Sequence, residues 1–176
     1  RIDKDLLSKH KEGLIVLSGC PSSELSKKII LGDHEKINEC ISWFKETFQE
    51  DYYLEIMRHE LVPDQEKINQ WIINNYKKLG IKIVATNDNH YETSKDYDKE
   101  ILLKNVRSNS PNGRKDILED NSYYIMPPKE IREKFSDVIE ACDNTLEIAE
   151  KCDIKIDFSQ TMIPQFNTPN EKDAFT

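Results

Sequence analysis

Asp88 and His90 are the residues in this sequence whose types and spacing point most directly to chemistry. They follow a run of β-branched and aliphatic residues within 81–91, IKIVATNDNHY, which predicts a buried strand that ends in polar side chains. In extended backbone, residues two apart project to the same side, and a carboxylate and an imidazole placed in this way can share a divalent cation. The same pattern is typical of a turn with an Asx cap, so alone it leaves both interpretations open.

Two further aliphatic runs upstream end in residues that can bind metals. Residues 13–18, GLIVLS, lead through Gly19 to Cys20, and residues 52–57, YYLEIM, lead through Arg58 to His59. Each run is long enough for a strand covered on both faces, as in parallel α/β sheets. The sequence therefore predicts three strands that each end in a possible metal ligand.

Cys20, His59, Asp88 and His90 are the predicted metal ligands. The carboxyl ends of parallel strands lie at one edge of the sheet, which is where α/β folds build their sites. Glu55 lies on the same side of its strand as His59, by the period of two, but deeper in the sheet. Glu55 is therefore a second-tier candidate.

The segments between these strands are predicted to be helices that begin at capping residues and carry apolar stripes. They run from Ser22 or Ser23 through Ile30, from Asp33 through Phe48, and from Asp64 through Leu79. The resulting order, β-α-α-β-α-β, has crossovers long enough for parallel strands. The predicted fold class is therefore α/β.

After residue 91 the pattern becomes less regular. We predict a helix capped by Ser94 or Asp96, a turn-rich break over 109–113, a short strand over 122–126, a helix opened by Pro127 and Pro128, and a helix over 137–152. From residue 158 onward the chain carries prolines and little periodicity, which indicates a linker.

Composition limits the classes of protein that this sequence can represent. The chain has 176 residues, of which 33% are charged and 37% hydrophobic, and it contains no apolar run long enough for a membrane span and no signal-peptide pattern. We expect a cytoplasmic protein with no membrane partner. The net charge of -8 argues against a free-standing DNA-coating protein. It is compatible with a metal-dependent site for phosphate esters, because there the cations supply the positive charge.

Five motifs, in order, resemble one known family. LIVLSGC, DYYLEIMRH, IVATNDNHY, DNTLEIAEKC and PQFNTP closely resemble the PHP (polymerase and histidinol phosphatase) domain of bacterial replicative DNA polymerase III alpha subunits, which are C-family polymerases. The resemblance implies part of a distorted (β/α)7 barrel whose rim binds up to three metals, usually zinc, manganese or iron. The family's metal-binding Cys, His, Asp and His match Cys20, His59, Asp88 and His90.

The resemblance also implies how the chain is divided. Residues 1–126 correspond to a partial PHP barrel, 127–160 to its helical end, and 161–176 to a linker toward the polymerase palm. The family's H-x-H strand and its earlier ligands precede residue 1, so we expect a fragment with an incomplete metal site. By the same resemblance, the palm with its magnesium-dependent catalytic aspartates would lie beyond these residues, so we expect the fragment not to polymerise. Lys99 and Glu100 stand where many relatives carry a His.

Two functions remain open for the parent protein in DNA replication. In the first, the PHP domain is a metal-dependent 3′ to 5′ exonuclease that removes misincorporated nucleotides. In the second, it is a structural module whose metals stabilise the barrel, and which packs against the palm and a proofreading subunit. The implied partners are DNA, through the parent polymerase, and other replicase subunits. We also expect the fragment to self-associate through its open barrel edge.

Overall fold

A three-stranded parallel sheet forms the centre of the fold in the computed structural model, which describes residues 2–108 and 121–159. The strands β1 (Val16–Leu17), β2 (Tyr52–Ile56) and β3 (Lys82–Ala85) lie in the order β1-β2-β3. Val16 pairs with Tyr52, and Leu54 pairs with Ile83. The predicted parallel α/β arrangement is confirmed, with all three carboxyl ends at one edge of the sheet.

β1 is shorter than the predicted strand over 13–18. Gly13 has a φ of 74°, in the left-handed region, and the N–H of Leu14 donates to the carbonyl of Lys11 in a turn. The chain therefore becomes extended only after this turn. The described residues form this open sheet, and the complete seven-stranded barrel implied by the resemblance is not seen in them.

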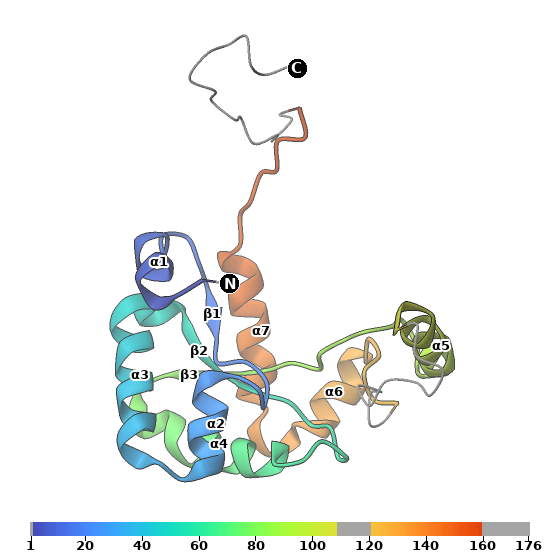
Figure 1. Cartoon of the computed structure of the whole chain (residues 1–176), viewed down its shortest axis with the longest axis horizontal. Helices are drawn as coiled ribbons and strands as arrows, with labels where there is room; N and C mark the ends of the chain where they lie inside the picture. The colour runs from blue at the N-terminus through green and yellow to red at the C-terminus, as the bar shows by residue number, and fades with distance from the viewer. Residues whose placement is uncertain (1, 109–120, 160–176) are drawn as a thin grey trace.

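Four helices surround the sheet and build one apolar core. They are α2 (Glu24–Leu31), α3 (His34–Phe48), α4 (Gln65–Leu79) and α7 (Glu140–Lys151). In Figure 1, α3 and α7 lie on different sides of the sheet. α4 packs on β2 and β3, and α7 packs on β3. Leu54, Ile83 and Phe135 are completely buried in this core.

The predicted extents of the first helices are confirmed, but one predicted cap is wrong. The side chains of Ser23 and Asp33 accept hydrogen bonds from the N–H groups of Ser26 and Lys36. Asp64 precedes α4 as predicted but makes no such bond. Its φ is 61°, whereas a capping side chain needs the backbone in the β region to reach the first turn.

A short helix before β1 was not predicted from the sequence. It is α1 (Lys4–Lys9), and the side chain of Asp3 accepts a hydrogen bond from the N–H of Leu6 at its start. It has only six residues, of which Leu6 and Leu7 are apolar, and this is too few to form a helical stripe that periodicity could detect.

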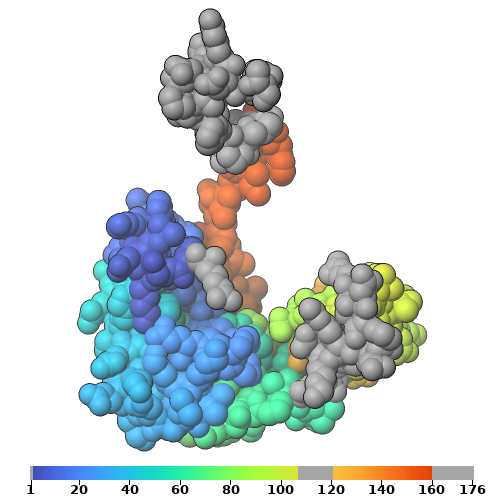
Figure 2. Space-filling view, in the orientation of Figure 1, coloured from blue at the N-terminus to red at the C-terminus, as the bar shows by residue number. Residues whose placement is uncertain are grey.

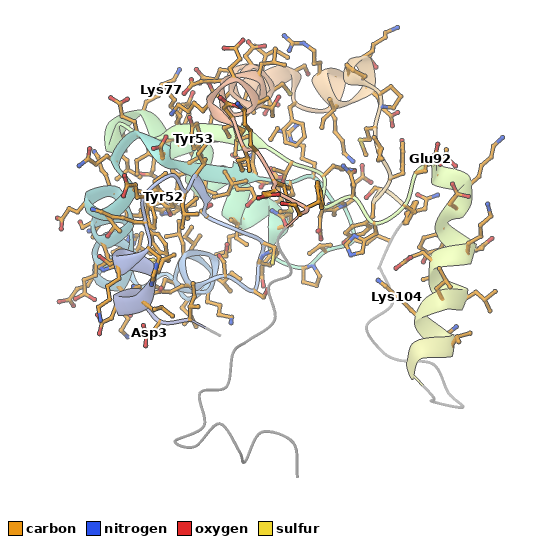
Figure 3. The ribbon with its side chains drawn as sticks, turned by 90° about the horizontal axis from the view of Figure 1, so that it is seen from above. Asp3, Tyr52, Tyr53, Lys77, Glu92 and Lys104 are labelled. Carbon is orange, nitrogen blue, oxygen red and sulfur yellow. The ribbon has the colours of Figure 1, made fainter. Side chains whose placement is uncertain are left out.

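The second half of the chain departs from its predicted elements in two places. Thr93, rather than Ser94 or Asp96, caps the 3₁₀ turn Ser94–Asp96, which leads into α5 (Tyr97–Ser108). The predicted strand over 122–126 is reduced to one bridge, between Tyr91 and Tyr124, because residues 87–91 have already left the sheet. Figure 1 shows α5 at a distance from the sheet, and the yellow-green atoms of this part of the chain project from the main body in Figure 2. Figure 3 shows the same helix, with Lys104, away from Tyr52 and Tyr53.

The helical end of the chain folds back onto the sheet. α6 (Pro128–Lys134) begins at a proline as predicted, and a 3₁₀ turn, Ser136–Val138, leads into α7. Residues 161–176, the predicted linker, and the predicted break at 109–113 lie outside the described residues. Among the helices that the structure does describe, none has the length and apolar character needed to cross a membrane.

Glu147 joins α7 to the amino ends of two strands. Its carboxylate accepts a hydrogen bond from the Tyr53 hydroxyl at 2.7 Å, and Lys82 Nζ lies 2.7 and 2.6 Å from its two oxygens. The hydrogen bond from Lys82 is the main cause that lowers the pKa of Glu147 to about 2 from its usual value of 4.5. The ionised form of Glu147 therefore stabilises the packing of α7 on the sheet.

Glu147→Gln is expected to lower the free energy of unfolding by roughly 1–2 kcal/mol at neutral pH, since it removes charge-assisted bonds from a partly exposed network. Because the folded-state pKa lies below the unfolded one, this stabilisation is present above about pH 4.5 and is lost as the pH falls toward 2. Urea unfolding at a series of pH values tests both statements. Glu150→Gln, also on α7, is the control. Equal effects of the two substitutions would contradict the assignment.

Candidate functional site at the carboxyl edge of the sheet

Glu55 lies at the middle of the sheet edge and links the loops that follow β1 and β3. Its side chain is buried, with the residue only 8% exposed. One carboxylate oxygen accepts from the N–H of Gly19 at 2.9 Å, and the other accepts from the Thr86 hydroxyl at 2.6 Å. Its own N–H donates to Ser18 Oγ at 2.8 Å. Glu55 therefore positions the two loops that carry Cys20 and Asp88.

Cys20 lies on the first of these loops and is partly buried. Its sulfur is 3.0 Å from Ser22 Oγ, just before the start of α2. The preceding Gly19 has a φ of 84°, and a Cβ at that position would lie 3.0 Å from the Cβ of Ser23. The path of the chain from β1 to Cys20 therefore requires glycine at position 19.

His59 follows β2 and is almost fully covered, at 4% exposure. Its Nδ1 lies 2.6 Å from the Ser122 hydroxyl. Its ring stacks on that of Tyr123, with centroids 4.0 Å apart and planes 5° from parallel. Two residues from a distant part of the chain thus hold this imidazole in place.

Asp88 and His90 are brought together by a turn rather than by extended backbone. Asp88 has a φ of 46°, so the argument from a period of two does not hold at this point. His90 Nδ1 donates to the backbone carbonyl of Asp88 at 2.5 Å and lies 4.0 Å from its carboxylate. The two side chains are neighbours as predicted. However, the backbone between them turns, and the carbonyl of Asp88 accepts a hydrogen bond from the imidazole nitrogen of His90.

The structure places the predicted ligands at one edge without assembling them into a metal site. His59 and His90 both contact Tyr123, through a stacked pair at 4.0 Å and an edge contact at 5.4 Å. Within residues 2–108 and 121–159, no three His, Cys, Asp or Glu side chains lie close enough to hold one metal ion. As these residues lie, they do not fit a bound cation, and the metal site remains a prediction.

Sequence reasoning missed the residues that hold the histidines. Asn87, at 4% exposure, donates to the carbonyls of Ser122 and Tyr124 at 2.7 and 2.9 Å. Its position directly after a buried strand was a signal for such a role. Nothing in the local pattern around Tyr123 indicated stacking on His59, because that contact joins residues 64 positions apart.

Arg58 connects the sheet edge to the helical end of the chain. Its guanidinium bonds the carboxylate of Asp137 at 2.7 Å, donates to the carbonyl of Lys134, and lies 5.0 Å from the centre of the Phe135 ring. The hydrogen bond from Arg58 lowers the pKa of Asp137. A cavity of about 740 Å³ lies beside these residues and is lined by Arg58, His59 and Asp137, among others.

Comparison with known proteins gives this edge its family context. Residues 1–59, which include Cys20 and His59, match the PHP domain. DNA polymerase III subunit alpha of Borreliella burgdorferi is 36% identical over 174 residues, which cover 97% of this chain and 15% of that protein. This chain is homologous to a segment of DNA polymerase III subunit alpha. The resemblance predicted from the motifs is therefore confirmed.

Other DNA polymerase III alpha subunits match over a similar span. Those of Chlamydia pneumoniae and Thermus aquaticus are each 34% identical, over 93% and 96% of this chain. The chain spans about 14–16% of the length of these DNA polymerase III alpha subunits. Asp88 and His90 lie outside the PHP match, although nearly the whole chain is covered by the relatives.

Gly19→Ala is expected to destabilise the protein by roughly 2–3 kcal/mol, since it adds a steric overlap to the cost of a left-handed alanine. Gly13→Ala is the matched control: its φ is similarly positive, but a Cβ there meets nothing within 4 Å. We expect Gly13→Ala to lower the free energy of unfolding by about 1 kcal/mol. Urea unfolding of both variants measures the difference. Equal losses would contradict the close packing assigned to the Cys20 loop.

Proposed function

We propose that this chain acts in chromosomal DNA replication as part of a DNA polymerase III alpha subunit. The observation that supports this proposal is 36% identity to such a subunit over 97% of the chain. The proposed partners are DNA and the other replicase subunits. We assign polymerisation, which would use magnesium, to parts of the alpha subunit outside the matched segment.

Within that protein, we propose that the segment serves first as a structural module. Glu55 links the loops after β1 and β3, and Arg58 links the end of β2 to residues 134–137. These contacts support a structural role, because the described polar groups at the sheet edge mainly bond to one another. A rigid edge of this kind suits a domain on which neighbouring parts of a polymerase pack.

A metal-dependent 3′ to 5′ exonuclease is the second candidate, and the position of Cys20, His59, Asp88 and His90 after the carboxyl ends of three parallel strands supports it. Zinc, manganese and iron suit this mixture of thiol, imidazole and carboxylate. Cations would also offset the net charge of -8 where a phosphate approaches. We expect ligands from outside this chain to complete such a site.

A chimaera tests the proposed replication role. The matching segment of the Borreliella burgdorferi alpha subunit is replaced by this chain, and primer extension on a primed single-stranded template is measured. We expect the chimaera to extend primers, because a homologous segment should support the same packing. A chimaera that carries a scrambled segment of equal composition is the control and should be inactive. A folded but inactive chimaera would contradict the proposal.

The same chimaera separates the structural reading from the catalytic one. Asp88→Asn combined with His90→Ala is expected to lower its zinc, manganese or iron content, measured by mass spectrometry of the metals, and to leave primer extension intact. His34→Ala, at an exposed helix start, is the control. Loss of 3′-end degradation with the fold and primer extension unchanged would favour the exonuclease. Unchanged metal content would refute these two residues as ligands.

We also propose that the isolated chain self-associates through β1. The outer side of β3 is partly closed, because Asn144 of α7 donates to the carbonyl of Ile83. β1 has β2 as its one strand neighbour in the described sheet. The N–H of Ser18 points to β2, so the alternation along the strand directs the N–H of Leu17 outward. Such an edge can pair with another chain.

Leu17→Pro is expected to shift the chain toward monomer in sedimentation equilibrium, because proline removes the outward N–H and blocks edge pairing. Val16→Pro is the matched comparison: its N–H faces β2 by the same alternation, so that variant should lose stability instead. A wild-type chain that stays monomeric at high concentration would show that β1 does not mediate association.

A further inference from the structure

A short stretch after the end of α7 alternates between charged and apolar side chains. It is residues 153–158, DIKIDF, and we call it the tail segment. Residues 152–157 are in neither helix nor strand, and Figure 1 shows them drawn out beyond α7. The apolar members, Ile154, Ile156 and Phe158, are 78%, 68% and 91% exposed. Such alternation is typical of a strand, although in the described part of the chain no strand pairs with these residues.

The β1 strand has an uncovered apolar face beside its open edge. Leu17 pairs with Tyr53, whose hydroxyl bonds Glu147 of α7, so the Leu17 side chain lies on the α7 side of the sheet. A groove of about 880 Å³ lies beside β1 on that side. Its apolar lining includes Leu14, Ile15, Leu17, Phe48, Ile148 and Ile154. Within the described sheet, β1 therefore offers an edge without a second strand neighbour and an apolar surface next to it.

The groove and the tail segment meet at Ile154, which lines the groove but is largely exposed. The tail segment then runs away from the sheet in Figure 1, and Ile156 and Phe158 do not line the groove of their own copy. A second copy of the chain carries the same groove and the same segment. A two-fold axis between the copies lets each tail segment fill the groove of the other.

We propose that two copies of this chain associate by exchange, in which the tail segment of each copy adds as a strand to the β1 edge of the other. This proposal rests on the self-association proposed above and names the segment that β1 binds. The backbone of the added strand accepts from the N–H of Leu17, and its apolar side chains enter the groove. In strand addition of this kind, backbone bonds supply affinity and alternate side chains supply specificity.

The length and the charge of the tail segment fit this place. Six extended residues span about 20 Å, at roughly 3.3 Å per residue, which exceeds the length of β1. In the added strand, Asp153 and Asp157 turn toward the face of the sheet that carries α1, because α1 contacts the aromatic rings of α3 through Lys4. Lys9 and Lys11, with one acidic residue, stand just before β1. Opposite charges therefore meet on one side of the added strand, and apolar side chains meet on the other.

Sedimentation equilibrium of point variants tests which surface carries the association. Ile156→Asp should raise the dimer dissociation constant about tenfold or more, because a charge then enters the groove. Two controls should leave the constant nearly unchanged: Lys155→Asp, on the opposite side of the same segment, and Leu102→Asp, at an exposed leucine of α5. An unchanged constant in Ile156→Asp, or an equal effect of Leu102→Asp, would overturn the exchange.

A mixture of two variants distinguishes exchange from direct pairing of two β1 edges. Leu17→Pro keeps the tail segment and loses the edge, whereas Ile156→Asp keeps the edge and loses the segment. Exchange predicts that each variant alone is largely monomeric and that the mixture forms a one-to-one dimer, read by native mass spectrometry, because one complete contact remains. If Ile156→Asp dimerises like the wild type while Leu17→Pro does not, self-association through β1 stands and the exchange is refuted.

The last test supplies the tail segment as a separate peptide, so that it does not depend on a dimer. A fluorescent peptide of residues 153–159 is titrated with the full chain, and the same peptide with Ile156→Asp is the control. We expect the first peptide to bind the wild-type chain, to dissociate its dimer when in excess, and not to bind Leu17→Pro. Binding to a chain that stays monomeric would refute self-association and support recognition of the tail segment by β1. No binding, or equal binding of both peptides, would overturn that recognition.

Discussion

The parallel pairing of β2 with β1 on one side and β3 on the other is the interaction on which this structure depends. All five residues of β2 are buried, and Leu54 and Ile83 are completely enclosed in the core. Because paired parallel strands run in one direction, their carboxyl ends meet at one edge. The loops that carry Cys20, His59, Asp88 and His90 are therefore neighbours before any of their side chains make a contact.

The burial of polar side chains then limits the contacts that these loops can make. Glu55 and Asn87 are 8% and 4% exposed, so their polar atoms need partners inside the protein. Glu55 bonds Gly19 and Thr86, and Asn87 bonds the backbone of the 122–125 segment. The same contacts that satisfy these buried groups fix the loops, and they direct the imidazoles toward Ser122, Tyr123 and backbone oxygens. Gathering ligand-type residues at an edge is thus distinct from forming a metal site.

The helical end of the chain belongs to the same core as the sheet. Phe135, Val138 and Cys142 are buried together with Leu54, and Arg58 joins the end of β2 to Asp137. In the related alpha subunits, a segment of this kind makes up about one-sixth or less of the protein. A compact core with polar contacts at one edge is consistent with a module that supports larger neighbours.

The sequence by itself determined the order of the strands and helices from β1 to β3 and, to within one residue, the positions at which α2, α3 and α4 end. Aliphatic runs, Ser23 and Asp33 as caps, and glycines at 32 and 80 are local signals, and local backbone preferences decide them. Five motifs also identified the PHP relationship. The tertiary structure alone decided that Tyr123 lies on His59, that Asp88 curls back toward His90, and that Glu55 joins two loops. These contacts join distant segments or depend on a left-handed backbone at a non-glycine residue, and the packing of the whole core, rather than local preference, determines such features.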